Sequence, residues 1–271
     1  MLTRGRAGLV LIASLFIKIE ARAVELKKDT IDAFDRYVAS AEVRLQPRFR
    51  GDHFLWSDDS AEYRQQVSQA MVVIQPAQNR GITEIKGGLI HDWMGAVLIR
   101  STRLAKTMAV VQDYSRHKDI YRPEVAQAEI RSRQGNNFDV FMRIVKSKLF
   151  LTDVLNTEQE IRFVPVDEKR IYSRAYSTKI AEVSDAGKSN EHELPPGKDR
   201  GLLWRMVGYW FFEERDGGVY VECEAISLTR DVPLGMGKLF GPIVRSMPAE
   251  SLRISLEHTR NAVAAATEDR R

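Results

Sequence analysis

The chain has 271 residues, of which 44% are hydrophobic and 29% are charged. These proportions are ordinary for a globular protein and exclude a long disordered or fibrous chain. The formal net charge is +4, but residues 1–23 carry four basic side chains and one acidic one, so the remainder carries only +1. No basic block remains in that part, and nucleic acid is therefore not an expected partner.

The first 23 residues have the pattern of an export signal. A positive start, MLTRGR, precedes the apolar run AGLVLIASLFI, and Ala21-Arg22-Ala23 fits the cleavage rule for signal peptides. The apolar run is shorter than the roughly 20 residues that a membrane span needs. We therefore expect an exported protein, periplasmic or secreted, cleaved near Ala23. A short buried helix or an uncleaved anchor is the alternative.

Helical patterns fill residues 24–70, which we interpret as an N-terminal extension. Apolar residues recur at helical spacing over 29–46, where Asp29 or Thr30 can cap the helix and Pro47 can end it. A second helix is expected over 60–70. The pattern then changes to strands, with a short one at 71–75 and a long one over 82–99. Gly87-Gly88 and Gly95 interrupt the long strand and predict strong curvature.

The second half reads as antiparallel strands between helices. One or two helices are expected over 101–121. Three hairpins follow, with turns at QGNN, at Asp167-Glu168-Lys169 and at Arg215-Asp216-Gly217-Gly218. A polar loop over 184–199 lies between the second and third hairpins. A short helix over 234–244 and a long one from Met247, with Pro248 in its first turn, precede a tail at 265–271.

Several stretches of residues 71–264 resemble bacterial members of the START/Bet v 1-like (SRPBCC) helix-grip superfamily. They are GGLIHDWMGAVLI, MAVVQDYSRHKDIYRPEV, GYWFFEERDGGVYVECEAISLTRDVP and FGPIVRSMPAESLRISLEHTRNAV. The resemblance implies an α+β fold, in which a curved antiparallel sheet wraps around a long C-terminal helix. It also implies an apolar cavity under that helix. The superfamily includes lipid and sterol carriers, quinone-binding proteins, polyketide cyclases and oxygenase subunits, so it does not specify one reaction.

His91 and Asp92 are the polar pair in the middle of the long strand. Because neighbours on a strand point to opposite faces, the two cannot form a face-to-face pair unless a bulge intervenes. His91 is then a structural histidine, a cavity-lining group or a general acid–base. On the strand after Gly218, small side chains alternate with glutamates. We expect Cys223 and its same-face neighbours to point inward, and Glu222 and Glu224 to face solvent.

The leading hypothesis is an exported binding protein that holds a lipid-, quinone- or polyketide-like molecule in this cavity. No cofactor is expected, and no histidine or cysteine spacing indicates a metal site. A cyclase or aromatase acting in the same cavity and an interaction module with a filled cavity are the alternatives. The hypothesis leaves open a transient contact with a membrane and identifies no protein partner. The residues expected to line the cavity are His91, Trp93, Tyr114, Met206, Trp210, Val221, Cys223, Ala225, Leu252 and Leu256.

Overall fold

The computed structural model describes residues 26–148, 151–231 and 237–268. The expected signal peptide and its cleavage site near Ala23 lie outside these residues. None of the described helices is long and apolar enough to span a membrane.

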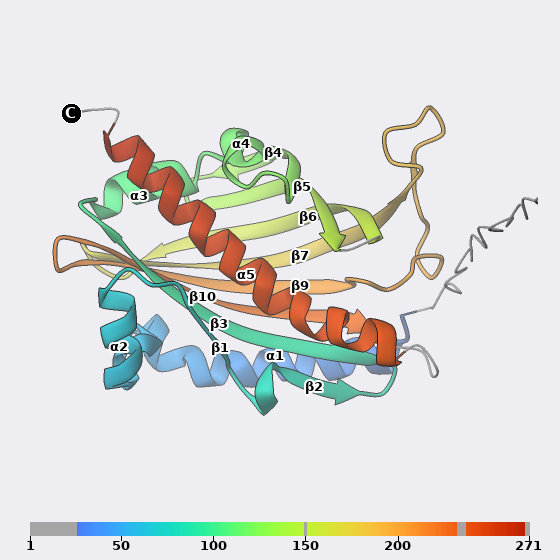
Figure 1. Ribbon diagram of the computed structural model, residues 1–271, viewed down its shortest axis with the longest axis horizontal. Coiled ribbons are helices and arrows are strands. Elements are labelled where there is room, and N and C mark those ends of the chain that lie inside the picture. The colour runs from blue at the N-terminus through green and yellow to red at the C-terminus, as the bar shows by residue number, and fades with distance from the viewer. Residues whose placement is uncertain (1–25, 149–150, 232–236, 269–271) are drawn as a thin grey trace, which may run out of the picture.

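One large antiparallel sheet organises the chain (Figure 1). Its strand order is β1-β3-β10-β9-β7-β6-β5-β4, with β2 paired to β3 and β8 paired to β7. The strands are β1 Val73–Pro76, β2 Ile82–Ile85, β3 Gly88–Arg100, β4 Val125–Gln134, β5 Asn137–Lys148, β6 Leu151–Pro165, β7 Arg170–Ser184, β8 His192–Glu193, β9 Arg205–Arg215 and β10 Gly218–Arg230.

The three hairpins predicted from their turn residues are confirmed. They pair β4 with β5, β6 with β7, and β9 with β10. At the third turn, Asp216 and Gly217 both have positive φ angles, +54° and +74°. A two-residue turn of this kind matches the right-handed twist of the strands that it joins. Local turn chemistry therefore specifies this part of the fold.

The predicted long strand over 82–99 is wrong in one respect, because it is two strands. β2 and β3 form a hairpin around Gly87, whose φ is +81°. The pairing of β3 with β10 runs without a break from Gly88 to Arg100, so Gly95 marks no bulge. A Cβ at Gly95 would instead lie 2.5 Å from Leu256 Cδ1. Gly95 thus allows the last helix to approach the strand closely.

A single helix, α5 (Gly237–Glu268), crosses one face of the curved sheet. This arrangement is the helix-grip fold that the sequence resemblance implied. The expected break before Met247 is absent, since the helix continues through Pro248. A proline inside a helix costs about 3 kcal/mol. Burial of the apolar stripe of α5, which includes Leu252, Leu256 and Val263, offsets that cost.

The other helices are short, except for α1 (Lys28–Phe49). The α1 helix runs two residues past Pro47, and its N-cap is Lys27 rather than Asp29 or Thr30. Residues 101–121 form three short helices, where one or two were expected. The remaining helices are the 3-10 helix η1 Trp56–Asp59, α2 Ala61–Ser68, the 3-10 helix η2 Asn79–Gly81, α3 Leu104–Val111, the 3-10 helix η3 Tyr114–Arg116 and α4 His117–Ile120.

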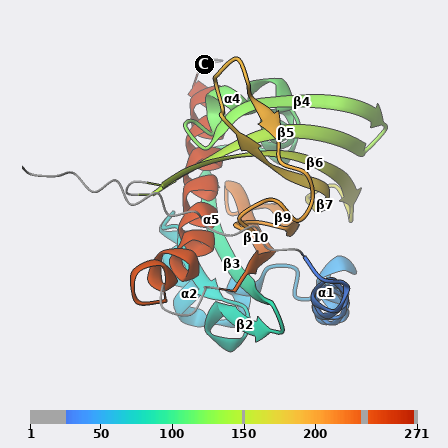
Figure 2. The ribbon, with the colours of Figure 1, turned by 90° about the vertical axis from the view of Figure 1, so that its right-hand side faces the viewer.

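The helices α1 and α5 lie on opposite sides of the β3–β10 part of the sheet (Figure 2). Each side has its own hydrophobic core. On the α1 side, Phe49 stacks on Phe211 with ring centroids 5.9 Å apart. On the α5 side, Leu252 and Leu256 pack in a cluster with Val97. The central strands are therefore covered on both faces.

The expectation that Glu222 and Glu224 face solvent is wrong. Their side chains are only 1% and 2% exposed, because α1 and η1 cover that face of the sheet. Arg44 on α1 binds both carboxylate oxygens of Glu224, at 3.0 and 2.6 Å. The Glu222 carboxylate accepts hydrogen bonds from the backbone N–H groups of Trp56 and Ser57. Each buried charge thus has a partner, as burial requires.

Arg44 also lies 3.5 Å from Asp92 on β3, which makes it the shared cation of two buried acids. Burial raises the pKa of Asp92 to about 7, and the nearby Glu224 adds to that effect. An acid with a raised pKa binds more protons when folded than when unfolded. Its contribution to stability therefore falls as the pH rises from about 4 to 7.

We expect Arg44→Met to lower the free energy of unfolding by about 3–5 kcal/mol at pH 8, because it leaves two buried carboxylates without a cation. The loss should be clearly smaller at pH 5, where Asp92 is protonated. Urea unfolding at both pH values measures it. Arg36→Met, at an exposed position on the same helix, is the matched control. An equal loss at both pH values would contradict this account.

Candidate functional site

A cavity of about 330 Å³ lies between α5 and strands β5, β6, β7, β9 and β10. The segment from α3 to the start of β4 closes one side of it. Its size is at the lower end of the range for small-molecule sites. Most of the wall is apolar, with a few polar groups at separate positions. A largely apolar space of this kind suits a hydrophobic molecule with limited polarity.

Six of the ten residues expected to line the cavity do line it: Tyr114, Met206, Trp210, Cys223, Ala225 and Leu252. The space arises from the pairing of two small residues, Ala225 on β10 and Gly208 on β9. A Cβ at Gly208 would meet only Trp210, at 3.6 Å. The alternation of β10 predicted the small inward side chain of Ala225, but no sequence signal identified Gly208 as its partner.

The other four expected residues do not line the cavity. Leu256 is seated against Gly95, and the Trp93 ring lies against Gly81, 2.5 Å from where a Cβ would be. Val221 is fully buried in the packed core on the α5 side. These three side chains fill space instead of bordering it, because glycines opposite two of them allow close contact.

His91, the fourth, lies behind the cavity wall. Its Nε2 is 3.0 Å from Thr229 Oγ1, and Thr229 itself lines the cavity. Burial lowers the pKa of His91 to about 4, so the ring is neutral at pH 7. Asp92 points to the opposite face, where it accepts a hydrogen bond from Tyr37 at 2.9 Å. The two residues therefore cannot act together as an acid–base pair.

Aromatic and imidazole rings form one end of the cavity. Tyr114 and His117 have ring centroids 4.5 Å apart, and the Tyr121 hydroxyl is 2.9 Å from the Thr259 hydroxyl on α5. His117 Nε2 donates to the Val111 carbonyl, and burial lowers the pKa of His117 to about 4. Within the described residues, no three His, Cys, Asp or Glu side chains gather as a metal site would require.

Three hydroxyl side chains follow the cavity face of α5 at intervals of four residues: Ser251, Ser255 and Thr259. Ser255 and Thr259 donate to the carbonyls of the residues four positions earlier, at 2.9 and 2.8 Å. Eight residues of helix span about 12 Å, so the stripe follows much of the cavity. The sequence analysis expected Leu252 and Leu256 of this helix in the cavity but none of the three hydroxyl residues.

A lysine and a glutamate in the cavity wall were also missed. Lys146 Nζ on β5 donates to Ser251 Oγ at 2.9 Å, and burial lowers the pKa of Lys146. Glu124, just before β4, has a buried oxygen, Oε2, with no hydrogen-bond partner. Single charged residues in a polar stretch are ordinary surface features. No pattern in the sequence therefore distinguishes these two from exposed ones.

The third charged group in the wall, Asp153, is already paired. It binds Arg200, which also donates from Nε to Glu182 at 2.6 Å. Arg200 lies just before Leu202 and Leu203, which line the cavity. The ion pairs therefore attach the loop before β9 to the sheet at this end of the cavity.

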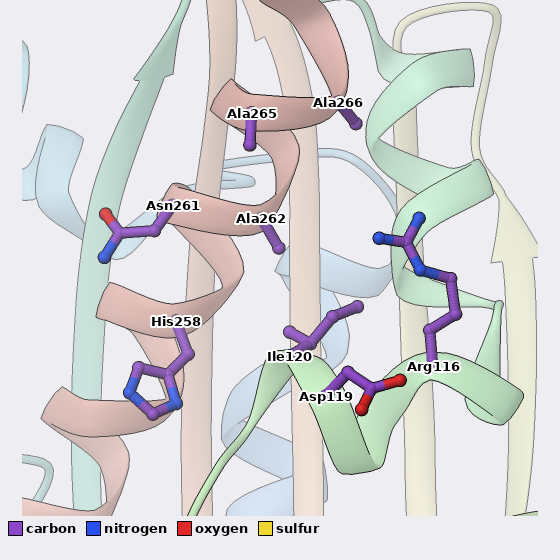
Figure 3. Close-up of a pocket in the computed structure, with 8 residues that line it drawn as sticks. All are labelled: Arg116, Asp119, Ile120, His258, Asn261, Ala262, Ala265 and Ala266. Carbon is purple, nitrogen blue, oxygen red and sulfur yellow. The ribbon is translucent and has the colours of Figure 1, made fainter. Parts of the chain in front are cut away.

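A second hollow, of about 530 Å³, lies between α4 and the last turns of α5 (Figure 3). Arg116, Asp119 and Ile120 line one side of it, while Asn261 and three alanines of α5 line the other. His258 borders both this hollow and the cavity. The two spaces therefore approach each other at His258.

We expect neither His91 nor His117 to gain a proton between pH 8 and pH 5, because burial holds both rings neutral. Since the unfolded chain protonates its histidines near pH 6.5, stability should fall as the pH drops from about 6.5 towards 4. NMR titration of the histidine ring protons checks this, with the urea-unfolded chain as the reference. A folded-state midpoint near 6.5 for His91 would contradict the buried structural role.

No protein-family model and no curated protein matches the sequence. Solved structures do show similarity. A protein from Thermus thermophilus has a TM-score of 0.45 and 14% identity, over 64% of this chain and 97% of that one. A STAR-related lipid transfer protein fragment from Xanthomonas axonopodis has a TM-score of 0.44 and 14% identity, over 68% and 98%. The Zhui aromatase/cyclase from a Streptomyces species has a TM-score of 0.42 and 16% identity, over 67% of this chain and 95% of that one.

Proposed function

We propose that the protein binds a hydrophobic small molecule, lipid-, quinone- or polyketide-like, in the cavity between the sheet and α5. The observation that carries this proposal is the unfilled apolar space beside Ala225 and Gly208, between the sheet and α5. Apolar burial would supply affinity at roughly 25 cal/mol per Å² of area removed from water. A transient contact with a membrane would suit the delivery of such a ligand.

Binding is a better proposal than catalysis for this site. A cyclase would need a group that exchanges a proton near neutral pH. His91 and Asp92 point to opposite faces, and burial lowers the pKa of His117 to about 4. Burial also raises the pKa of Tyr114. These groups favour a passive wall over an acid–base constellation.

We expect Ala225→Leu to weaken binding of the neutral dye Nile red at least tenfold, because three added carbon atoms occupy the cavity. Fluorescence titration of the purified protein measures the affinity. Ala126→Leu, at an exposed position on β4, should leave it unchanged. Failure of the unaltered protein to bind Nile red, with no adduct in native mass spectrometry after exposure to apolar probes, would overturn the proposed function.

We also propose that the protein is exported, as the pattern of residues 1–23 suggests. Expression of the full chain in a bacterium, followed by cell fractionation and N-terminal sequencing, tests this. The expected product is a periplasmic or secreted protein that starts at Val24. A product in the cytoplasm that retains Met1 would contradict it.

A further inference from the structure

Lys146 has hydrogen-bonding capacity that the described residues do not use. An ammonium group has three N–H donors. The Lys146 Nζ donates to Ser251 Oγ at 2.9 Å and makes no other hydrogen bond within the described part of the chain. The side chain lines the cavity, so its remaining donors are available to a bound molecule.

Glu124 has the complementary capacity in the same cavity wall. Its Oε2 is buried and accepts no hydrogen bond. The Lys146 ammonium is attracted by Glu124, but the two make no direct ion pair among the described residues. The cavity therefore presents an unused acceptor and unused donors that do not satisfy each other. Buried polar groups are ordinarily hydrogen-bonded, so both residues have binding capacity for a molecule in the cavity.

The charges of the wall restrict which ligand group can satisfy both. The Asp153 carboxylate is paired with Arg200, so Lys146 and Glu124 remain as one positive and one negative group. A ligand carboxylate would accept a hydrogen bond from Lys146 but would be repelled by Glu124. Glu250, which also attracts the Lys146 ammonium, opposes a ligand carboxylate in the same way. A ligand ammonium would meet the opposite conflict. A neutral hydroxyl accepts one hydrogen bond and donates another, so it suits both groups.

We infer that the ligand carries a terminal alcohol or phenol hydroxyl, which accepts a hydrogen bond from Lys146 Nζ and donates one to Glu124. This inference rests on the proposed function, since it places the polar end of a molecule whose apolar body fills the cavity. Ser251 holds the lysine in position from the helix side. Lys146 and Glu124 then determine specificity, and the apolar wall supplies most of the affinity.

Four retinoids that share one apolar body test the inference: retinol, retinoic acid, retinylamine and retinyl methyl ether. Each competes with Nile red for the purified full-length protein. Retinol should bind at least tenfold more tightly than each of the other three. The methyl ether separates donation from acceptance, because it has the same oxygen without the proton that Glu124 needs.

Two single variants should shift the preference in opposite directions. Glu124→Gln leaves Lys146 without its opposing carboxylate, so retinoic acid should gain affinity and overtake retinol. Lys146→Met leaves Glu124 without the ammonium, so retinylamine should gain instead. Glu158→Gln and Lys179→Met alter an exposed pair 3.8 Å apart on the neighbouring strands β6 and β7, and should leave the order of the four retinoids unchanged. Cooperative urea unfolding shows that each variant is folded.

The outcomes separate this inference from the proposed function. If the unaltered protein binds neither Nile red nor any retinoid, the proposed function fails, and the inference falls with it. If Nile red binds but retinol is not preferred, or if the two variants do not shift the preference in opposite directions, only the hydroxyl inference is overturned.

Discussion

The pair of strands β3 and β10 is covered on both faces, and the arrangement of the molecule depends on this constraint. A strand buried on both sides cannot place acidic side chains in water. The acids of this pair, Asp92, Glu222 and Glu224, therefore need partners from whatever covers them. Arg44 supplies a cation to two of them, and the backbone of η1 supplies N–H groups to the third. The helix α1 and the sheet are thus fitted to each other chemically as well as by shape.

The two faces differ in how well they are filled. On the α1 side, Phe49 contacts Tyr172, Tyr209 and Phe211, which form a packed aromatic cluster. On the α5 side, the small residues Gly208 and Ala225 leave space. An unfilled space costs stability, since its lining atoms lose contacts. The packed core on the α1 side offsets that cost, which allows the opposite face to remain open to a ligand.

Much of the fold could be predicted from the sequence, because its signals are local. Turn residues located the three hairpins, and alternation separated the faces of β10. The predicted surroundings of one face were wrong, because Glu222 and Glu224 were expected in solvent and are buried. The expectation that the polar face of a strand is exposed assumes that one face of the sheet contacts water. Here α1 covers that face and excludes the water. Nothing within β10 itself indicates that a helix some 180 residues earlier supplies Arg44 to it.

The candidate site was less predictable, because it depends on contacts between distant elements. Tyr114, Trp210 and Ala225 could be assigned to the cavity from apolar character and strand face. Leu256 on α5 could not be excluded from the cavity lining, because its position depends on its contact with Gly95 on β3. Lys146 meets Ser251 across 105 positions of sequence. A lysine in an alternating strand gives no sign that the final helix will cover it.

The contact at Gly95 also limits how α5 can move. Leu252 and Leu256 hold one edge of the helix against β3, whereas Ser251, Ser255 and Thr259 face the cavity from the other edge. Lifting the helix away would expose the whole apolar seam to water. Pivoting it about the line of its contact with Gly95 keeps the leucine edge seated while the hydroxyl edge rises from β5. The easiest way to widen the space is therefore a rotation of the helix in place, with the glycine contact as its axis.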